Sequence, residues 1–227
     1  MNFYSQHKKH FVAVDCIIFG FDQQKIHILL HKRKFQPYLG GWSLFGGFLQ
    51  ENENLDDAAV RILLSLTGFS GIYLEQLYTY GNVKRDQERV ISVAYYALIN
   101  TEQYSSLEGG DYDAVWIPLE EIPKLVLDHN VMVNKAMRRL KRKAASEPIG
   151  FELLPEKFTL PRLQKLYEAI YREDFDKRNF RKKLLSMGLL KKLDEKDKSA
   201  SKKGAFLFRF DKQKYDELLS EGSGFEF

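Results

Sequence analysis

The sequence of 227 residues contains a single cysteine, Cys16, which excludes an internal disulfide framework and favours a reducing compartment. It also lacks any apolar run that approaches the roughly 18–20 residues needed to span a membrane. Residues 1–10 are polar and do not form the apolar region of a secretory signal. These absences predict a cytoplasmic protein.

The formal net charge is only +4, but the charges are unevenly distributed along the chain. Residues 1–156 hold 17 basic and 19 acidic side chains, whereas residues 157–227 hold 18 and 12. Within residues 177–214 the basic side chains outnumber the acidic ones 14 to 4. A mildly acidic first part and a locally basic second part suggest two different tasks, and the basic part is a candidate for contacts with a phosphate backbone.

The first part alternates strands with two helices, which predicts an α+β domain. Runs rich in β-branched and aromatic residues predict strands at residues 11–21, 26–33, 72–80, 89–98 and 114–118. Helices are expected over residues 55–67 and 128–145, and a loop over residues 105–113. The small, polar segment that ends at Pro148 predicts a linker, so we divide the chain into domains 1–147 and 148–227.

The helix expected over residues 55–67 follows a glycine pair and a short loop. Gly46 and Gly47 predict a tight turn, and Gly68 a left-handed helix end. Asn54 can cap the start of the helix. The apolar positions share one wide stripe at helical period: Leu55, Ala58, Ala59, Ile62, Leu63 and Leu66.

Residues 47–69 resemble the Nudix box. The residues on its pattern are Gly47, Glu53, Arg61, Leu63, Gly68 and Phe69. The three positions that hold metal-binding glutamates in the family read Ile62, Ser65 and Leu66. Carboxylates are needed there to hold the divalent cation that activates water against a pyrophosphate. The resemblance therefore implies a Nudix-like α/β/α sandwich that keeps the Glu53–Arg61 ion pair, has no catalytic residues and binds no metal. In addition, Phe45 replaces the proline that often precedes the box.

An active hydrolase of ADP-ribose or a nucleotide-sugar remains the alternative, with metal held by Glu51, Glu53 and Glu88. If the domain instead binds a small effector, polar and aromatic side chains near the box are the candidates. They are Arg33, Trp42, Glu53, Arg85, Glu88 and Arg89. Each has a plain structural alternative, because Trp42 can belong to the core and Glu53 can serve only to pair with Arg61. His129 is expected to orient the last helix of the domain rather than to bind metal.

The second domain has the order helix, short turn, basic helix and basic hairpin, which predicts a winged helix-turn-helix. Thr159 and Pro161 are expected at the start of the first helix, and the second spans residues 177–187. Strands are predicted at residues 189–190 and 205–210, separated by a charged segment without periodicity.

A basic helix of this length fits the major groove of DNA. Arg178 can read guanine and Asn179 adenine, at roughly 1–3 kcal/mol of discrimination each. The other predicted DNA contacts are cations: Arg162, Lys177, Arg181, Lys182, Lys202 and Lys203. Two alternatives remain, a helical domain with a solvated cationic face and an RNA-binding regulator; the basic helix has no aromatic platform for the latter.

The two domains together resemble the NrtR family of Nudix-related transcriptional regulators. The similarity covers nearly the whole chain and is carried by several short runs: residues 114–118, 127–129, 153–155, 158–160, 163–164, 166–168, Asp176, 178–182 and Gly188. It implies a homodimer that binds operator DNA, with a catalytically silent Nudix domain that senses an effector. The sequence looks most similar to the arabinose-responsive AraR-type branch. We therefore expect a repressor of sugar catabolism that senses L-arabinose, with an ADP-ribose sensor controlling NAD metabolism as the alternative.

Overall fold

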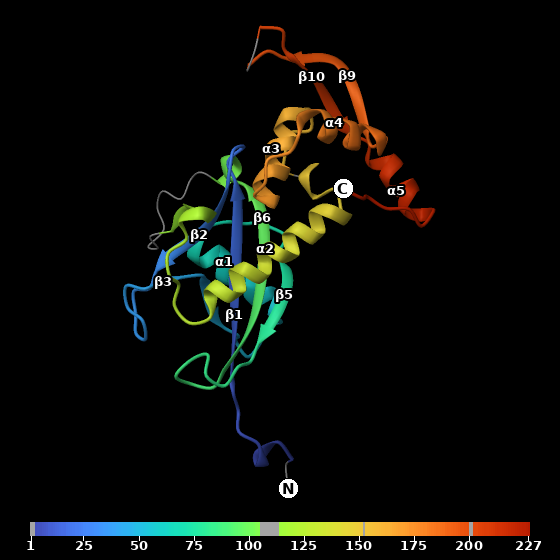
Figure 1. Ribbon diagram of the computed structural model, residues 1–227. Coiled ribbons are helices and arrows are strands. Elements are labelled where there is room, and N and C mark those ends of the chain that lie inside the picture. The colour runs from blue at the N-terminus through green and yellow to red at the C-terminus, as the bar shows by residue number, and fades with distance from the viewer. Residues whose placement is uncertain (1–2, 105–113, 152, 200–201) are drawn as a thin grey trace. The chain divides into compact units, whose positions relative to one another are not determined.

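The structure is a computed structural model that describes residues 3–104, 114–151, 153–199 and 202–227. The chain forms two compact units (Figure 1). The first comprises Met1–Gly20 and His27–Ala136, and the second comprises Phe21–Ile26 and Met137–Phe227. The loop predicted at residues 105–113 lies outside the described residues.

The first unit is built on a seven-stranded sheet, whose main path runs β3-β2-β1-β6-β5. Strand β4 pairs with β1, and β7 pairs with β2. The strands are β1 (Phe11–Phe21), β2 (Ile26–Lys32), β3 (Trp42–Ser43), β4 (Phe45–Phe48), β5 (Glu75–Tyr80), β6 (Val90–Asn100) and β7 (Val115–Pro118). Short 3-10 helices lie at η1 (Phe3–Gln6), η2 (Thr101–Tyr104) and η3 (Leu119–Glu121). The five predicted strands are confirmed to within a few residues at their ends.

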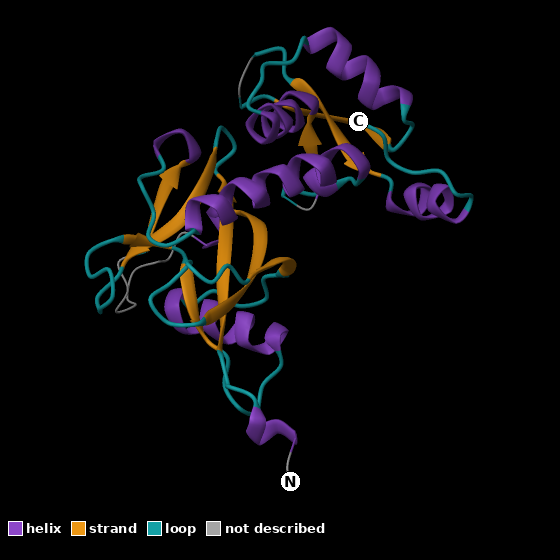
Figure 2. Cartoon of the chain, turned by 60° about the horizontal axis from the view of Figure 1, so that its bottom comes forward, coloured by secondary structure: helices purple, strands orange, loops and turns teal. Residues whose placement is uncertain are grey.

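Helices α1 (Leu55–Thr67) and α2 (His129–Ser146) complete the first unit, although α2 continues into the second. Figure 2 shows the strands between α1 and the start of α2. The apolar stripe of α1 packs on β1 and β6, in a core that includes Val14, Ile18, Ile62, Leu63 and Tyr95. Asn54 precedes the helix, and Gly68 ends it at φ 72°. Burial of this stripe is what fixes the helix against the sheet.

The glycine pair before α1 is not a turn, and that prediction is wrong. Gly46 and Gly47 lie inside β4, opposite Asp15 and Val14 of β1. A Cβ atom on Gly47 would lie 3.1 Å from the side chain of Ile62. The glycines are therefore suited to close packing of strand against strand and helix, and not to a left-handed backbone.

The second unit contains η4 (Ile149–Phe151), β8 (Phe158–Thr159), α3 (Leu160–Tyr171), α4 (Lys177–Ser186), β9 (Leu190–Asp197), β10 (Ala205–Phe210) and α5 (Lys212–Ser220). Its three strands have the order β8-β10-β9. Thr159 caps α3 by accepting a hydrogen bond from the backbone N–H of Arg162. One prediction is corrected here, because β9 is far longer than the strand expected at residues 189–190. Helix α5 was not predicted.

The core of the second unit is strongly aromatic. The ring of Phe227 lies 4.3 Å from that of Tyr167 and 5.4 Å from that of Phe180, between centroids. Phe180 and Leu184 form the buried side of α4. In the described ranges, no helix is both long and apolar enough to cross a membrane.

Candidate functional site

The loop before α1 is held to the helix by an ion pair. Two nitrogens of Arg61 donate to the two carboxylate oxygens of Glu53, at 2.6 and 2.7 Å. The same guanidinium donates to the carbonyl of Phe48 at the end of β4. The hydrogen bonds from Arg61 hold the pKa of Glu53 below its usual value. The predicted pair is confirmed, and because both oxygens of Glu53 are used, this carboxylate is committed to the scaffold.

The box positions on α1 do not fit a divalent metal. Ile62 is buried in the core with 2% of its surface exposed, and Leu66 packs against the same core. The hydroxyl of Ser65 donates to the carbonyl of Ile62. A hard cation needs several charged or carbonyl oxygens within reach, and these side chains offer one hydroxyl. Among the described residues there is also no group of three histidine, cysteine, aspartate or glutamate side chains placed to hold a metal ion.

A cavity of about 370 Å³ opens next to the box in the first unit. Its lining mixes apolar and charged side chains from the strands β1, β2, β3, β4 and β6, from helix α1, from the start of α2 and from the loops after β2 and before β6 and α2. The lining residues are Ala13, Asp15, His31, Arg33, Phe35, Ser43, Leu44, Gly46, Gly47, Phe48, Leu66, Arg85, Asp86, Val90, Leu127 and His129. We call it the effector cavity. A concave site with a few converging polar groups is typical of small-molecule binding.

Arg85 is the centre of the charged group in this cavity. Its side chain is 3% exposed and donates to both carboxylate oxygens of Asp128, at 2.9 and 3.2 Å. A second carboxylate, that of Asp15, lies 3.7 Å from the guanidinium and accepts a short hydrogen bond from Ser92. Arg85 occupies both oxygens of Asp128, whereas the Oδ1 atom of Asp15 is outside these hydrogen bonds and can accept one from the hydroxyl of a ligand.

His129, the first residue of α2, places a hydrogen-bond donor beside this group. Its Nδ1 accepts the backbone N–H of Leu44 at 3.2 Å, so a neutral ring carries its proton on Nε2. Nε2 lies 3.7 Å from Asp15 and has no hydrogen-bond partner among the described residues. Burial lowers the pKa of His129, and also that of His31, whose Nε2 donates to the carbonyl of Leu44. The expectation that His129 orients the helix is consistent with its bond to Leu44.

The structure brings two of the six predicted effector residues to this cavity. Arg33 lies over the ring of Phe35 at 4.3 Å, and Arg85 lies at the charged centre. The other four do not line it. Trp42 stands against Lys32, Glu53 pairs with Arg61, and Arg89 donates to the carbonyl of Gly81; Glu88 is exposed.

Several polar residues of the cavity were missed by the sequence analysis, notably Asp15, His31 and Ser43. Each lies in or beside an apolar strand and is at most 7% exposed. A charged residue within a run of apolar strand residues is the signal that could have identified Asp15, because burying a carboxylate is costly unless it is paired.

The second unit presents its cations on α4 and on the β9–β10 hairpin, which we call the wing. Asp176 caps α4 by accepting the backbone N–H of Asn179. The predicted contacts on this helix are all exposed: Lys177, Arg178, Asn179, Arg181 and Lys182. Lys202 and Lys203 are exposed between β9 and β10, whereas Arg162 is half-buried near the start of α3. A capped helix with a free basic face is able to enter a major groove.

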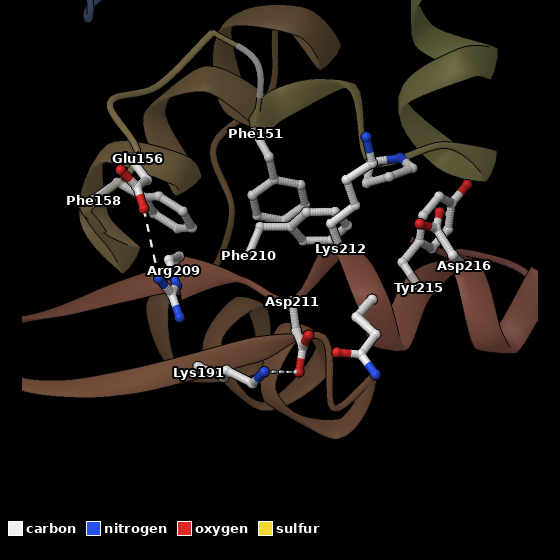
Figure 3. A pocket seen from close by; sticks show the side chains of 12 residues that line it. Phe151, Glu156, Phe158, Lys191, Arg209, Phe210, Asp211, Lys212, Tyr215 and Asp216 are labelled. Carbon is white, nitrogen blue, oxygen red and sulfur yellow. Dashed lines mark ion pairs between the residues drawn. The ribbon is translucent and has the colours of Figure 1, made fainter.

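A second cavity of about 660 Å³ lies at the base of the wing (Figure 3). The rings of Phe151 and Phe210 stack there with centroids 4.3 Å apart. Two of its three cations, Lys191 and Arg209, pair with Asp211 and Glu156, at 2.8 and 3.6 Å; the third, Lys212, lines the cavity together with a further acid, Asp216. These pairs neutralise the two cations, so this hollow is less suited to phosphate than the outer faces of α4 and the wing.

Comparison with known proteins identifies both units. Residues 9–138 match the NUDIX domain, and residues 150–210 match the NrtR DNA-binding winged helix domain. The chain is 36% identical over 217 residues to an ADPR responsive transcriptional repressor, NtrR, from Acinetobacter baylyi, covering 93% of this chain and 86% of the relative.

Two solved structures of NrtR from Shewanella oneidensis are also similar. The complex with a 27mer DNA has a TM-score of 0.75 at 30% identity and covers 94% of this chain and 97% of that one. The complex of its NUDIX domain with ADP ribose has a TM-score of 0.53 at 33% identity and covers 60% and 92%. The names of the Acinetobacter relative and of the second structure refer to ADP-ribose, and none of the three names refers to arabinose or sugar catabolism. The chain belongs to the NrtR family of DNA-binding transcriptional regulators, in which a Nudix domain is joined to a winged helix domain.

Proposed function

We propose that this protein is an ADP-ribose-responsive transcriptional repressor that binds operator DNA as a homodimer and does not hydrolyse its effector. The observation that carries the proposal is the effector cavity, where buried polar groups remain beside a box whose metal positions hold no carboxylate. The two related proteins named for ADP-ribose support this choice of effector.

The chemistry of the cavity suits a phosphorylated sugar. Asp15 and the Nε2 atom of His129 offer an acceptor and a donor for ribose hydroxyls. Arg33 is partly exposed, next to the ring of Phe35, and its guanidinium suits a pyrophosphate. L-Arabinose carries hydroxyls but no phosphate, so it would leave Arg33 without a charged partner.

The side chains of α1 support the proposal that the effector is not hydrolysed. Ile62, Ser65 and Leu66 provide no carboxylate, and Glu53 is held by Arg61. Neither the family's metal set nor the alternative set with Glu51 and Glu88 is then available in the described arrangement. Gly47 of the box and the adjacent Gly46 form part of the cavity wall.

The test is fluorescence anisotropy with a duplex that the purified protein selects from a random-sequence library. ADP-ribose, L-arabinose and other pentoses are added in turn. Release of the duplex by ADP-ribose alone supports the proposal, and release by L-arabinose alone would assign the protein to the sugar-responsive branch. No selection of any duplex, together with magnesium-dependent cleavage of ADP-ribose, would replace the repressor with a hydrolase.

A matched pair of variants ties the response to the cavity. Arg33→Gln should weaken release by ADP-ribose while leaving affinity for the duplex unchanged. Arg89→Gln removes a cation outside the lining, whose guanidinium donates only to a backbone carbonyl, and should respond as the wild type does. Equal responses of the two variants would place the effector elsewhere.

A further inference from the structure

The wing carries a partly exposed aromatic residue between two lysines. Phe206 lies in β10 with 36% of its surface exposed. The ammonium group of Lys192 lies 3.7 Å from the centroid of its ring, and that of Lys196 lies 4.5 Å from the same centroid. Both distances are within the range of about 6 Å at which a cation is attracted to the face of an aromatic ring.

The strand pairing explains how two lysines reach one ring. Lys196 stands directly opposite Phe206, and residues directly opposite each other in antiparallel strands share a face. Lys192 stands opposite Phe208, but the pairing shifts between Phe206 and Phe208. This irregularity brings β9 into a register in which the side chain of Lys192 also reaches the ring of Phe206.

Three cations close to these two lysines in the second unit are neutralised by ion pairs, and these two are not. Lys191 pairs with Asp211, and Arg209 with Glu156 (Figure 3). Lys157 pairs with Glu195 at 2.7 Å. For Lys192 and Lys196, both exposed, no carboxylate lies within ion-pair distance in the part of the chain that the structure describes. Their partner in the free protein is the ring of Phe206.

We infer that Phe206 holds Lys192 and Lys196 together as a phosphate-binding site on the wing, which contacts the DNA backbone beside the groove that α4 reads. The negative face of the ring offsets the repulsion between the two ammonium groups. It also restricts their rotamers before DNA arrives, which reduces the entropy lost on binding. The inference rests on the proposed DNA-binding function. This site does not include Lys202 and Lys203, the exposed lysines between β9 and β10 that the sequence predicts to contact DNA.

The first measurement is the salt dependence of affinity, with the duplex selected by the wild-type protein between about 50 and about 200 mM salt. Lys192→Ala should reduce the slope of log affinity against log salt by about 0.9, and the double variant Lys192→Ala/Lys196→Ala by about twice that. Lys191→Ala is the matched control, because Lys191 already pairs with Asp211, and it should leave the slope unchanged.

The second measurement separates positioning by the ring from a role in folding of the wing. Phe206→Leu should weaken binding on the order of fivefold, and Phe206→Tyr, which keeps the ring, should bind as the wild type does. In the background that lacks both lysines, Phe206→Leu should have no further effect, since there is nothing left to hold. Thermal unfolding of each variant verifies that it is folded.

The outcomes distinguish this inference from the function on which it rests. If the wild type selects no duplex, the DNA-binding function fails and the wing site fails with it. If the wild type binds selectively but Phe206→Leu binds equally well, the inference alone is overturned. It is also overturned if Phe206→Leu costs as much without the two lysines as with them, because the ring would then act on the fold of the wing.

Discussion

Arg85 is a buried cation that interacts with two carboxylates. It is buried between the carboxylates of Asp128 and Asp15. Removing one partner of a buried charge group leaves the others unpaired, at a cost of about 3–5 kcal/mol. Arg85→Met should therefore lower the free energy of unfolding by that amount, measured by urea denaturation.

Two controls, one at a nearby arginine and one at the partner of Arg85, accompany this variant. Arg89→Met removes a cation whose guanidinium bonds only to the carbonyl of Gly81 and should change stability by less than about 1 kcal/mol. Asp128→Asn should lose part of its effect in the Arg85→Met background, because the two side chains form one unit. Additive effects of Arg85 and Asp128 would show that the group is not coupled.

His129 gives the protein a pH dependence whose direction follows from burial. Desolvation lowers its pKa from 6.5, and the charges of Asp15, Asp128, Arg85 and Arg33 act on it more weakly. The unfolded chain takes up a proton near pH 6.5 while the folded chain does not, so stability is full above that pH and falls below it. Through His129, the free energy of unfolding changes by at most about 1.4 kcal/mol per pH unit.

The measurement is urea denaturation at a series of pH values from neutral pH into the acidic range. His129→Asn keeps an acceptor for the N–H of Leu44 but cannot take up a proton, so its stability should fall less steeply below pH 6.5. His31 contributes in the same direction, so some slope should remain. A wild-type protein that gains stability as the pH falls through this window would contradict the assignment of His129 as neutral.

At the scale of elements, α4 is the part that should discriminate between DNA sequences. Arg178 and Asn179 are exposed in its first turn, above the cap formed by Asp176. Arg178→Ala and Asn179→Ala should each reduce the preference for the selected duplex over a random one by about 1–3 kcal/mol. Binding to random DNA should change little for Asn179→Ala, which removes no charge.

The control on the same helix is Lys182→Ala, which should weaken binding to both duplexes alike, as loss of a phosphate contact does. Competition anisotropy with both duplexes measures the ratio directly. Equal losses on both duplexes for Arg178→Ala and Asn179→Ala would mean that these residues contact phosphates and that the reading residues lie at other positions of α4.

The elements that the sequence analysis found and missed differ in one physical respect. Helices α1 and α3 and strands β1 and β6 bury continuous apolar surface, which leaves a clear periodic pattern. Strand β4 was missed because Gly46 and Gly47 read as a turn when considered locally. Most of β9 is charged and little buried, so its pairing with β10 comes from tertiary context that no local pattern reveals.

Dependence on tertiary context also limits what could be predicted of the effector cavity. Arg33 and Arg85 stood out as charged residues near the box. Asp15 and His31 did not, because strands adjacent in the sheet bring them together from distant positions of an apolar sequence. The Glu53–Arg61 pair was predictable because it depends on motif spacing alone.

At the scale of the whole molecule, regulation requires that the effector has different affinities for the free and the DNA-bound protein. A cavity confined to the first unit and a basic helix confined to the second satisfy the need for two distinct sites. By thermodynamic linkage, any factor by which ADP-ribose weakens DNA binding must equal the factor by which DNA weakens ADP-ribose binding. Typical factors are about 5- to 150-fold.

This reciprocity is measurable with the full chain. Isothermal titration gives the affinity for ADP-ribose with and without a saturating amount of the selected duplex, and anisotropy gives the affinity for the duplex with and without ADP-ribose. The two factors should agree for the wild type and should both approach one for Arg33→Gln if that side chain distinguishes the two states. Release of DNA by ADP-ribose without any effect of DNA on ADP-ribose affinity would break this linkage and show that the nucleotide does not act by equilibrium binding to the protein. Wild-type factors in Arg33→Gln would show that it binds the protein outside the effector cavity.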